Sequence, residues 1–219
     1  MIGHRAFADE LEARIEHRYG DGGYRLGWRL LYSPAVVLEG TRVAFVGLNP
    51  GGGVQRDDHA EFAMSLGSAW VVESWKGRPP GKAPLQRQVL SLFELLGEKP
   101  EAVLSGNLVP FRSPDWDALP GDKKAAVEFG KDLWRDMILR ARPSLVIACG
   151  TRPFDALREA LGGTKPENYG LDWGRVTARR CAWPGGELLG LPHLSRFPVV
   201  TSRRDAVLQL LCGFIDERG

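Results

Sequence analysis

Residues 42–53 read Arg-Val-Ala-Phe-Val-Gly-Leu-Asn-Pro-Gly-Gly-Gly, and the rest of the chain is interpreted around this segment. Residues 43–46 are apolar and rich in β-branched and aromatic side chains, which predicts a strand buried on both faces. Pro50 disfavours helical geometry at Asn49, so Asn49 is expected in an extended or turn conformation at the end of this strand. Ligands of open α/β sheets bind just beyond the carboxyl ends of the strands. Asn49 is therefore a candidate site residue, although the same residues also fit a simple turn.

The bulk composition predicts one domain spanning residues 1–219. The chain is 43% hydrophobic and 26% charged, as in soluble globular proteins, and its net charge of +2 neither favours nor excludes a polyanionic partner. Its three cysteines, Cys149, Cys181 and Cys212, are far apart, which disfavours a zinc or iron–sulfur site and is typical of a reducing cytoplasm. We see no signal peptide and no apolar run of membrane-spanning length. We therefore expect a cytoplasmic protein without a membrane partner, cofactor or metal.

Hydrophobic periodicity predicts an α/β fold. Apolar residues at helical spacing predict helices over residues 7–19, 85–96 and about 122–140, with further helices after Thr151 and from Ser202. Asp58 and Glu61 have the spacing of a helix N-terminus. Buried strands are expected over residues 144–150, 175–182 and 188–191, besides 43–46 and an apolar run leading to Asn107. This alternation predicts a three-layer α/β/α sandwich around a mainly parallel sheet of four or five strands.

Three apolar strands end in a polar residue near a proline. Asn49 precedes a proline, Asn107 stands three residues before one, and His193 follows one. Because parallel strands end at the same edge of a sheet, these three side chains are expected to converge on one cleft. Each has a simpler role when it is considered alone, because a buried asparagine satisfies backbone groups and a lone histidine is often structural.

These residues resemble motifs of the uracil-DNA glycosylase superfamily, especially the mismatch-specific and single-strand-selective types. Residues 47–51, Gly-Leu-Asn-Pro-Gly, match the first motif of these branches, and Asn107 matches the asparagine that reads the uracil edge. His193-Leu194-Ser195 is similar to the His-Pro-Ser motif, with a leucine in place of proline. Phe62 has the spacing of the aromatic residue on which the family stacks uracil; Trp70 is an alternative, and Phe62 also fits core packing.

The resemblance implies a monofunctional glycosylase of DNA base-excision repair. Such an enzyme flips uracil, or a related deaminated or 5-substituted base, out of DNA and hydrolyses its N-glycosidic bond with a positioned water. Asn49 and His193 would be catalytic, because an amide oxygen can hold the water and an imidazole can stabilise charge on the uracil O2. The base pocket would be formed by Gly47, Leu48, Pro50, Gly51, Phe62 and Asn107. No lysine lies in these motifs, so a lyase step is not implied.

The resemblance also implies where DNA binds. The family inserts a wedge into DNA from the segment after the histidine, which predicts DNA contacts by Leu194, Ser195, Arg196 and Phe197. Surface charge would come from Arg78, Lys82, Arg203 and Arg204. The small residues 51–53 leave no bulky wall beside the base, which implies tolerance of 5-substituted uracils. The expected partner is DNA containing uracil or a related damaged base, with no obligatory protein partner and a monomeric state.

Other site types are less consistent with the sequence. A metal at residues 57–59, Asp-Asp-His, is disfavoured because consecutive loop residues rarely converge on one ion. Neither a phosphate-binding loop nor a serine-hydrolase elbow is present. The main alternative is a catalytically weak or inactive glycosylase-like module that binds damaged DNA or a nucleobase, since Asn49 and Leu194 replace an aspartate and a proline. An enzyme that acts on free nucleosides is a third reading.

Overall fold

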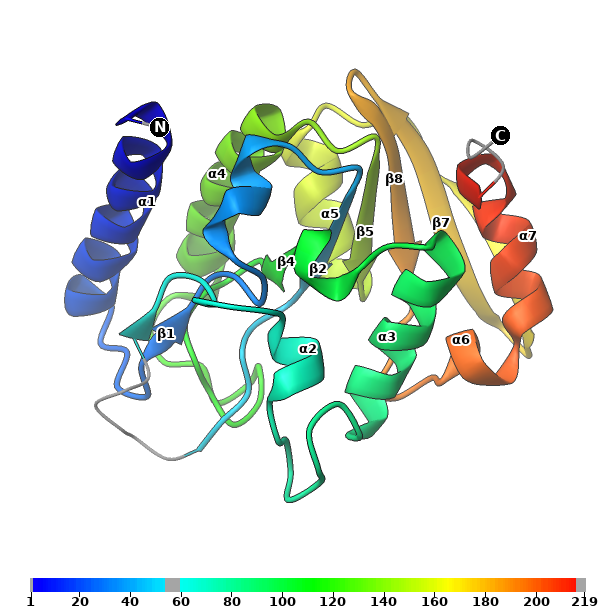
Figure 1. The fold of residues 1–219 in the computed structure, drawn as a ribbon, viewed down its shortest axis with the longest axis horizontal. Helices are drawn as coiled ribbons and strands as arrows, with labels where there is room; N and C mark the ends of the chain where they lie inside the picture. Colours follow the sequence, from blue (N-terminus) through cyan, green and yellow to red (C-terminus); the bar gives the residue numbers. More distant parts are fainter. Residues whose placement is uncertain (1, 54–59, 216–219) are drawn as a thin grey trace.

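The main sheet combines four parallel strands with an antiparallel hairpin. The computed structural model of the protein describes residues 2–53 and 60–215, and its six-stranded sheet has the order β4-β2-β5-β8-β7-β6 (Figure 1). The parallel strands are β4 (Leu104–Asn107), β2 (Val43–Gly47), β5 (Leu145–Cys149) and β8 (Gly186–Leu191). The antiparallel strands are β7 (Val176–Trp183) and β6 (Glu167–Trp173). The α/β class is confirmed, but the sheet has six strands rather than four or five because β6, which the sequence pattern does not predict, pairs with β7 and extends it.

A second, two-stranded parallel sheet lies beside β4. It consists of β1 (Trp28–Arg29) and β3 (Ala60–Glu61), and the chain after β1 bridges to β4 through Leu31 and Gly106. The helix start expected around Glu61 is wrong, while its proposed cap, Asp58, lies outside the described residues. The carbonyl oxygen of Glu61 accepts a hydrogen bond from the amide of Leu30 at 3.2 Å. Tertiary pairing therefore prevails over the local capping pattern.

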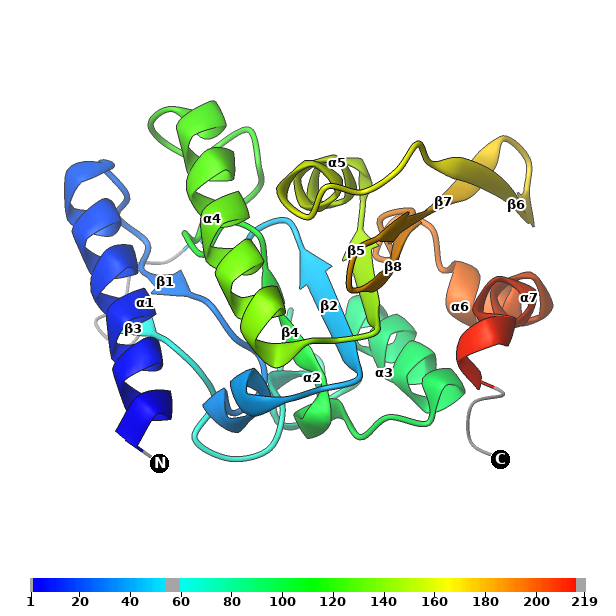
Figure 2. The same cartoon turned by 90° about the horizontal axis from the view of Figure 1, so that it is seen from above.

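Helices cover both faces of the main sheet (Figure 2). One face carries α1 (Ile2–Asp21), the 3-10 helix η1 (Ala35–Glu39), α4 (Lys123–Ala141) and α5 (Thr151–Ala160). The other carries α2 (Ala69–Val72), α3 (Pro84–Leu96), α6 (Val199–Ser202) and α7 (Arg204–Ile215); a short 3-10 helix, η2 (Pro100–Ala102), precedes β4. Successive side chains of β2 point to opposite faces of the sheet and so contribute to both core layers. Val43 and Phe45 pack on one face, and Ala44 and Val46 pack on the other.

The predicted helix positions are largely confirmed. α4 begins where Asp122 caps it, with Oδ1 accepting hydrogen bonds from the amides of Lys124 and Ala125 at 2.8 and 3.2 Å. α3 ends at Gly97, which adopts a left-handed conformation with φ 61°. The expected cap at Ser202 is wrong. Ser202 instead ends α6, which packs Val199 and Val200 into the core, and α7 begins at Arg204.

The four parallel strands end at one edge of the sheet. Gly47 of β2 lies opposite Asn107 of β4, and Cys149 of β5 lies opposite Leu191 of β8. Strands are about 4.8 Å apart, so this edge spans about 14 Å from β4 to β8. The segments that carry Asn49, Asn107 and His193 leave the sheet here. Within residues 2–53 and 60–215, no helix has both the length and the apolar character needed to cross a bilayer.

Candidate active site

Asn107, the last residue of β4, is fixed deep in the sheet edge. Only 6% of the residue is exposed, and its carbonyl oxygen accepts a 2.7 Å hydrogen bond from the indole Nε1 of Trp134. A Cβ on Gly47 would lie 2.5 Å from Oδ1 of Asn107, so the neighbouring strand must carry glycine at this position. Nδ2 of Asn107 is buried and makes no fully formed hydrogen bond to a described residue. The side chain is therefore closely confined while its amide nitrogen stays available.

Asn49 follows β2 in a half-buried turn, and Ser113 orients its amide. Nδ2 of Asn49 donates to Oγ of Ser113 at 2.8 Å, and this hydroxyl donates to the carbonyl oxygen of Asp115 at 2.6 Å. Because the only hydrogen of the hydroxyl is used on Asp115, Ser113 can only accept from Asn49. Nδ2 must therefore face Ser113, and Oδ1 faces away from it. This leaves an amide oxygen suited to holding a water.

His193 lies in the loop after β8, with its ring beside Gly150. Nδ1 is 2.9 Å from the hydroxyl of Ser195, and the His193 carbonyl oxygen accepts hydrogen bonds from the amides of Arg196 and Phe197. The loop therefore turns tightly although it lacks the proline of the motif. The side chain keeps an exposed side, but partial burial lowers its pKa below the usual 6.5, and the charges of Arg196 and Lys76 lower it further. The imidazole is therefore neutral at pH 7 and carries one hydrogen.

A cavity of about 310 Å³ opens next to His193 at the carboxyl ends of β5 and β8. Leu48 and the first residues of α5 line it together with His193. Three arginines also line it, Arg152, Arg179 and Arg196, and none of its described lining residues is a carboxylate. Asn49 and Asn107 do not line this cavity. The structure thus places all three predicted polar residues at one edge, with His193 in the cavity and the asparagines toward β4.

Leu194 does not have the role expected for it. The residue is 1% exposed, packs into the core beside α6 and α7, and its amide donates to Sγ of Cys149 at 3.4 Å. Its predicted contact with DNA is therefore wrong, because the side chain fills the core beneath the loop. Ser195 and Arg196 are exposed, and Phe197 is partly buried with the guanidinium of Arg196 5.8 Å from its ring.

The two aromatic candidates have different environments. Phe62 is partly buried and packs against the core beneath α1 and α4, and its carbonyl oxygen accepts from the amide of Leu31 at 2.9 Å. Trp70 is 2% exposed and donates to Oγ of Ser105 at 3.1 Å. Trp70 is therefore a core residue and is not placed to stack on a ligand. Phe62 keeps an exposed part.

The glycine turn contains a neighbour that the sequence did not indicate. Pro50 is buried, and a Cβ on Gly51 would meet nothing within 4 Å. A Cβ on Gly52, by contrast, would lie 2.5 Å from Nη2 of Arg112, and the φ of Gly52 is +133°. The guanidinium therefore occupies the space that the small residue opens. Arg112 follows Asn107 by five positions, but its approach to the turn depends on the fold.

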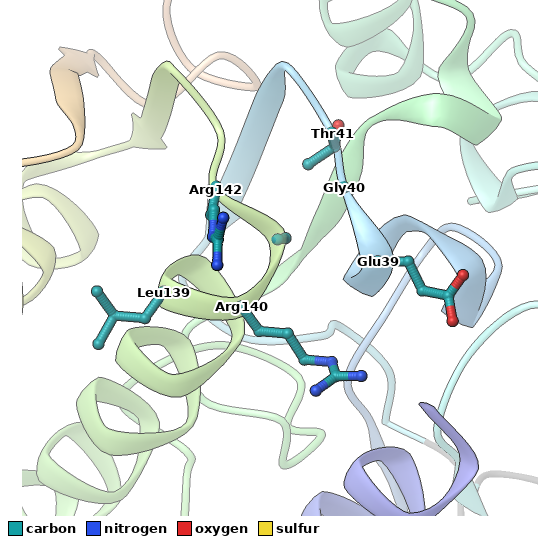
Figure 3. Close-up of a pocket in the computed structure, with 7 residues that line it drawn as sticks. Glu39, Gly40, Thr41, Leu139, Arg140 and Arg142 are labelled. Carbon is teal, nitrogen blue, oxygen red and sulfur yellow. The ribbon is translucent and has the colours of Figure 1, made fainter. Parts of the chain in front are cut away.

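Two other places are not part of this site. A larger depression of about 830 Å³ lies where β2 begins, at the opposite edge of the sheet, between η1 and the end of α4 (Figure 3). It is lined by exposed and backbone groups such as Glu39, Thr41 and Arg140. Asp57, Asp58 and His59 lie outside the described residues, and the part of the chain that the structure describes contains no group of three metal-ligating side chains.

No protein-family model matches the chain, and no curated protein matches its sequence.

Proposed function

We propose that the protein is a monofunctional DNA glycosylase that hydrolyses the N-glycosidic bond of uracil, or of a related deaminated or 5-substituted base. One observation carries the proposal. Asn49, Asn107 and His193 come from three separate strand ends and lie along one edge of the sheet, and the amide of Asn49 is turned so that its oxygen faces away from Ser113. The parallel strand order β4-β2-β5-β8 brings these three strand ends to the same edge of the sheet.

Each side chain suits one step of base release. The amide of Asn107 can donate to O4 of uracil and accept from N3–H, and cytosine presents the opposite pattern. A neutral His193 that donates from Nε2 can stabilise the negative charge that develops on O2 as the base departs. Nε2 carries the hydrogen when the Ser195 hydroxyl donates to Nδ1. Oδ1 of Asn49 can hold the water that attacks the sugar carbon, because the sugar is already electron-deficient in the transition state.

The charges around the cleft support a polyanionic substrate. The cavity beside His193 is lined by Arg152 of α5, Arg179 of β7 and Arg196 of the loop after β8, and Arg179 also pairs with Asp155 of α5 at 2.8 Å. The net charge of the whole chain is only +2, so the concentration of positive charge at this cavity is a local feature. A groove with one sign of charge attracts the phosphates of a DNA strand.

A single-turnover assay with a uracil-containing oligonucleotide tests this function. We expect the wild-type protein to release uracil and leave an abasic site, His193→Ala to abolish the reaction and Asn49→Ala to slow it at least tenfold. His17→Ala is the matched control, because His17 lies on the exposed face of α1 with 82% of its side chain accessible. Tight binding without base release overturns the enzyme in favour of a binding module. Base release from free nucleosides but not from DNA favours a nucleoside hydrolase.

A further inference from the structure

Tyr32 lies diagonally across from Asn107 on the same face of the sheet. The chain after β1 runs antiparallel to β4, with Leu31 bridged to Gly106 and the amide of Tyr32 donating to the carbonyl oxygen of Ser105 at 2.7 Å. Side chains two residues apart on a strand share a face, so Tyr32 faces the same layer as Ser105 and Asn107. Diagonal neighbours of this kind are within reach of an aromatic side chain.

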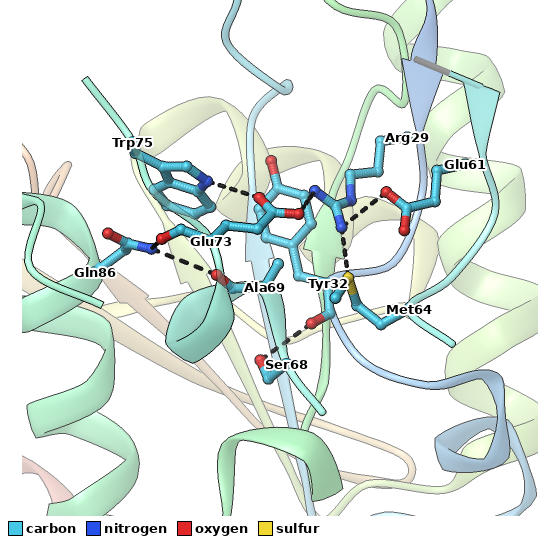
Figure 4. Close-up of polar contacts among 9 residues, drawn as sticks. All are labelled: Arg29, Tyr32, Glu61, Met64, Ser68, Ala69, Glu73, Trp75 and Gln86. Carbon is cyan, nitrogen blue, oxygen red and sulfur yellow. Dashed lines mark hydrogen bonds and ion pairs between the residues drawn. The ribbon is translucent and has the colours of Figure 1, made fainter. Parts of the chain in front are cut away.

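The ring of Tyr32 is held on two sides. The guanidinium of Arg29 lies 4.7 Å from the ring centroid, and the ring of Trp70 packs edge-on at 5.1 Å. Arg29 is only 5% exposed and is fixed in turn by Glu61 at 2.9 Å and Glu73 at 2.6 Å (Figure 4). A buried guanidinium between two carboxylates has little freedom to move. The phenol is therefore a rigid group.

The phenol of Tyr32 is a polar neighbour of the Asn107 side chain on this face of the sheet. Nδ2 of Asn107 is buried without a hydrogen bond to a described residue, and the Asn107 side chain is among the groups that lower the pKa of Tyr32 against the effect of burial. Burial raises the pKa of Tyr32, so its hydroxyl stays protonated at neutral pH. Oδ1 of Asn107 lies over Gly47, where there is no Cβ. The amide is thus confined at both ends, by a glycine at its oxygen and by a phenol at its nitrogen.

We propose that Tyr32 is a positioning residue for base recognition, because its hydroxyl accepts one Nδ2 hydrogen of Asn107 and fixes which way the amide faces. The inference rests on the proposed function and adds a specificity determinant to it. The second Nδ2 hydrogen and Oδ1 are then the groups left to pair with a base, and this is the pattern that pairs with O4 and N3–H of uracil. An amide rotated by 180° would present the pattern that pairs with cytosine. Tyr32 therefore sets the preference for keto over amino pyrimidines.

Tyr32→Phe tests the inference, because it removes the hydroxyl and keeps the ring against Arg29 and Trp70. We expect the ratio of the uracil and cytosine excision rates to fall about tenfold, the size expected when a buried amide loses its orienting hydrogen bond. Tyr24→Phe is the matched control. Tyr24 is also buried, but it stacks on Phe111 at 3.8 Å in the core layer of α1 and α4, and its loss should leave the ratio unchanged.

A measurement without substrate separates this inference from the proposed function. The side-chain amide signals of Asn107, assigned by their absence in Asn107→Ala, report its hydrogen bond directly by NMR. In Tyr32→Phe we expect one of its two Nδ2 hydrogens to exchange with solvent at least tenfold faster, whether or not any oligonucleotide is cleaved. Unchanged exchange, or an unchanged uracil-to-cytosine ratio in an active and folded variant, overturns the role of Tyr32. If Tyr32→Phe speeds the exchange of the Asn107 Nδ2 hydrogen as expected but the wild-type protein releases no base, only the proposed glycosylase function is overturned, and the positioning role of Tyr32 stands.

Discussion

The hydroxyl of Ser113 lies 2.8 Å from Nδ2 of Asn49 and 2.6 Å from the carbonyl oxygen of Asp115, and this chain of hydrogen bonds fixes which end of the Asn49 amide faces Ser113 and which end faces away from it. Ser113 is fully buried, so no solvent competes for its hydroxyl. The catalytic asparagine of the proposed reaction therefore depends on a residue that comes from the loop after β4.

Ser113→Ala should lower kcat about tenfold and leave KM nearly unchanged, because the amide loses its orientation while the base still meets Asn107. The free energy of unfolding should fall by about 1 kcal/mol, the usual net value of one hydrogen bond. Single-turnover rates and thermal melts measure both effects. Ser144→Ala is the control, because Ser144 is exposed at the opposite end of the sheet. A normal rate in Ser113→Ala would show that Asn49 needs no orienting partner.

Gly47→Ala should disrupt base recognition more than folding. The new methyl group would lie 2.5 Å from Oδ1 of Asn107, and the amide would have to move out of its place at the strand end. We expect kcat/KM on uracil to fall more than tenfold, with a stability loss of about 1–3 kcal/mol from overpacking. Gly213→Ala is the control, since its Cβ meets nothing within 4 Å and alanine favours the helix. Full activity in Gly47→Ala contradicts the placement of Asn107 at the base.

The rate should depend on pH through His193. Catalysis needs the neutral imidazole, and because partial burial lowers the pKa of His193 below 6.5, activity should be constant through neutral pH and fall only at lower pH. The positive charge of Arg196 contributes to this shift, so Arg196→Gln should move the acid limb of kcat toward higher pH. The pH profile of kcat at saturating DNA measures this. A limb above pH 6.5 in the wild type is the opposite of the expected result.

Leu194→Ala should destabilise the fold rather than weaken DNA binding directly. Its side chain is fully enclosed, so truncation should lower the free energy of unfolding by about 2–4 kcal/mol. Arg196 lies in the same loop, two positions after Leu194, but is exposed. Arg196→Ala should therefore change the free energy of unfolding by no more than about 0.5 kcal/mol and should weaken binding to DNA. Thermal melts and fluorescence anisotropy with labelled DNA separate the two effects. Equal stability of Leu194→Ala and the wild type would restore its assignment to the DNA surface.

Arg29→Met should destabilise the protein by about 2–4 kcal/mol. Removing the guanidinium leaves Glu61 and Glu73 without their shared cation, and both carboxylates are only partly exposed. Arg135→Met is the matched control, because Arg135 is exposed and its pair with Asp132 at 3.3 Å should contribute less than about 1 kcal/mol. Denaturant unfolding measures both. An equal loss of unfolding free energy in the two variants would mean that the buried ion pairs of Arg29 contribute no more to stability than an exposed pair.

The sequence predicted those parts of the fold that depend on local pattern. The strand at 43–46 and the helix capped by Asp122 follow from periodicity and capping, and the strand ends that carry Asn49 and Asn107 lie together as expected. β6 was missed because, of its seven residues, only Leu171 is buried, so its pattern carries no hydrophobic alternation.

The supporting residues of the site could not be found in the same way. Ser113, Arg29 and Tyr32, the last of these a proposed positioning residue, contact partners that are distant in the sequence, and nothing in their own neighbourhoods marks them. The predicted DNA contact of Leu194 fails for a related reason. The resemblance to the His-Pro-Ser motif places Leu194 in the loop after β8, but only the packing of α6 and α7 shows that its side chain faces the core.

The order of the parallel strands has a consequence for how the protein loses function. No fragment shorter than residues 49–193 contains both side chains of the proposed catalytic pair, and β5, which separates β2 from β8 in the sheet, must be docked before the two strand ends are held at one edge. Activity should therefore vanish at the same urea concentration as the near-ultraviolet signal of the packed aromatic residues, without a partly active intermediate.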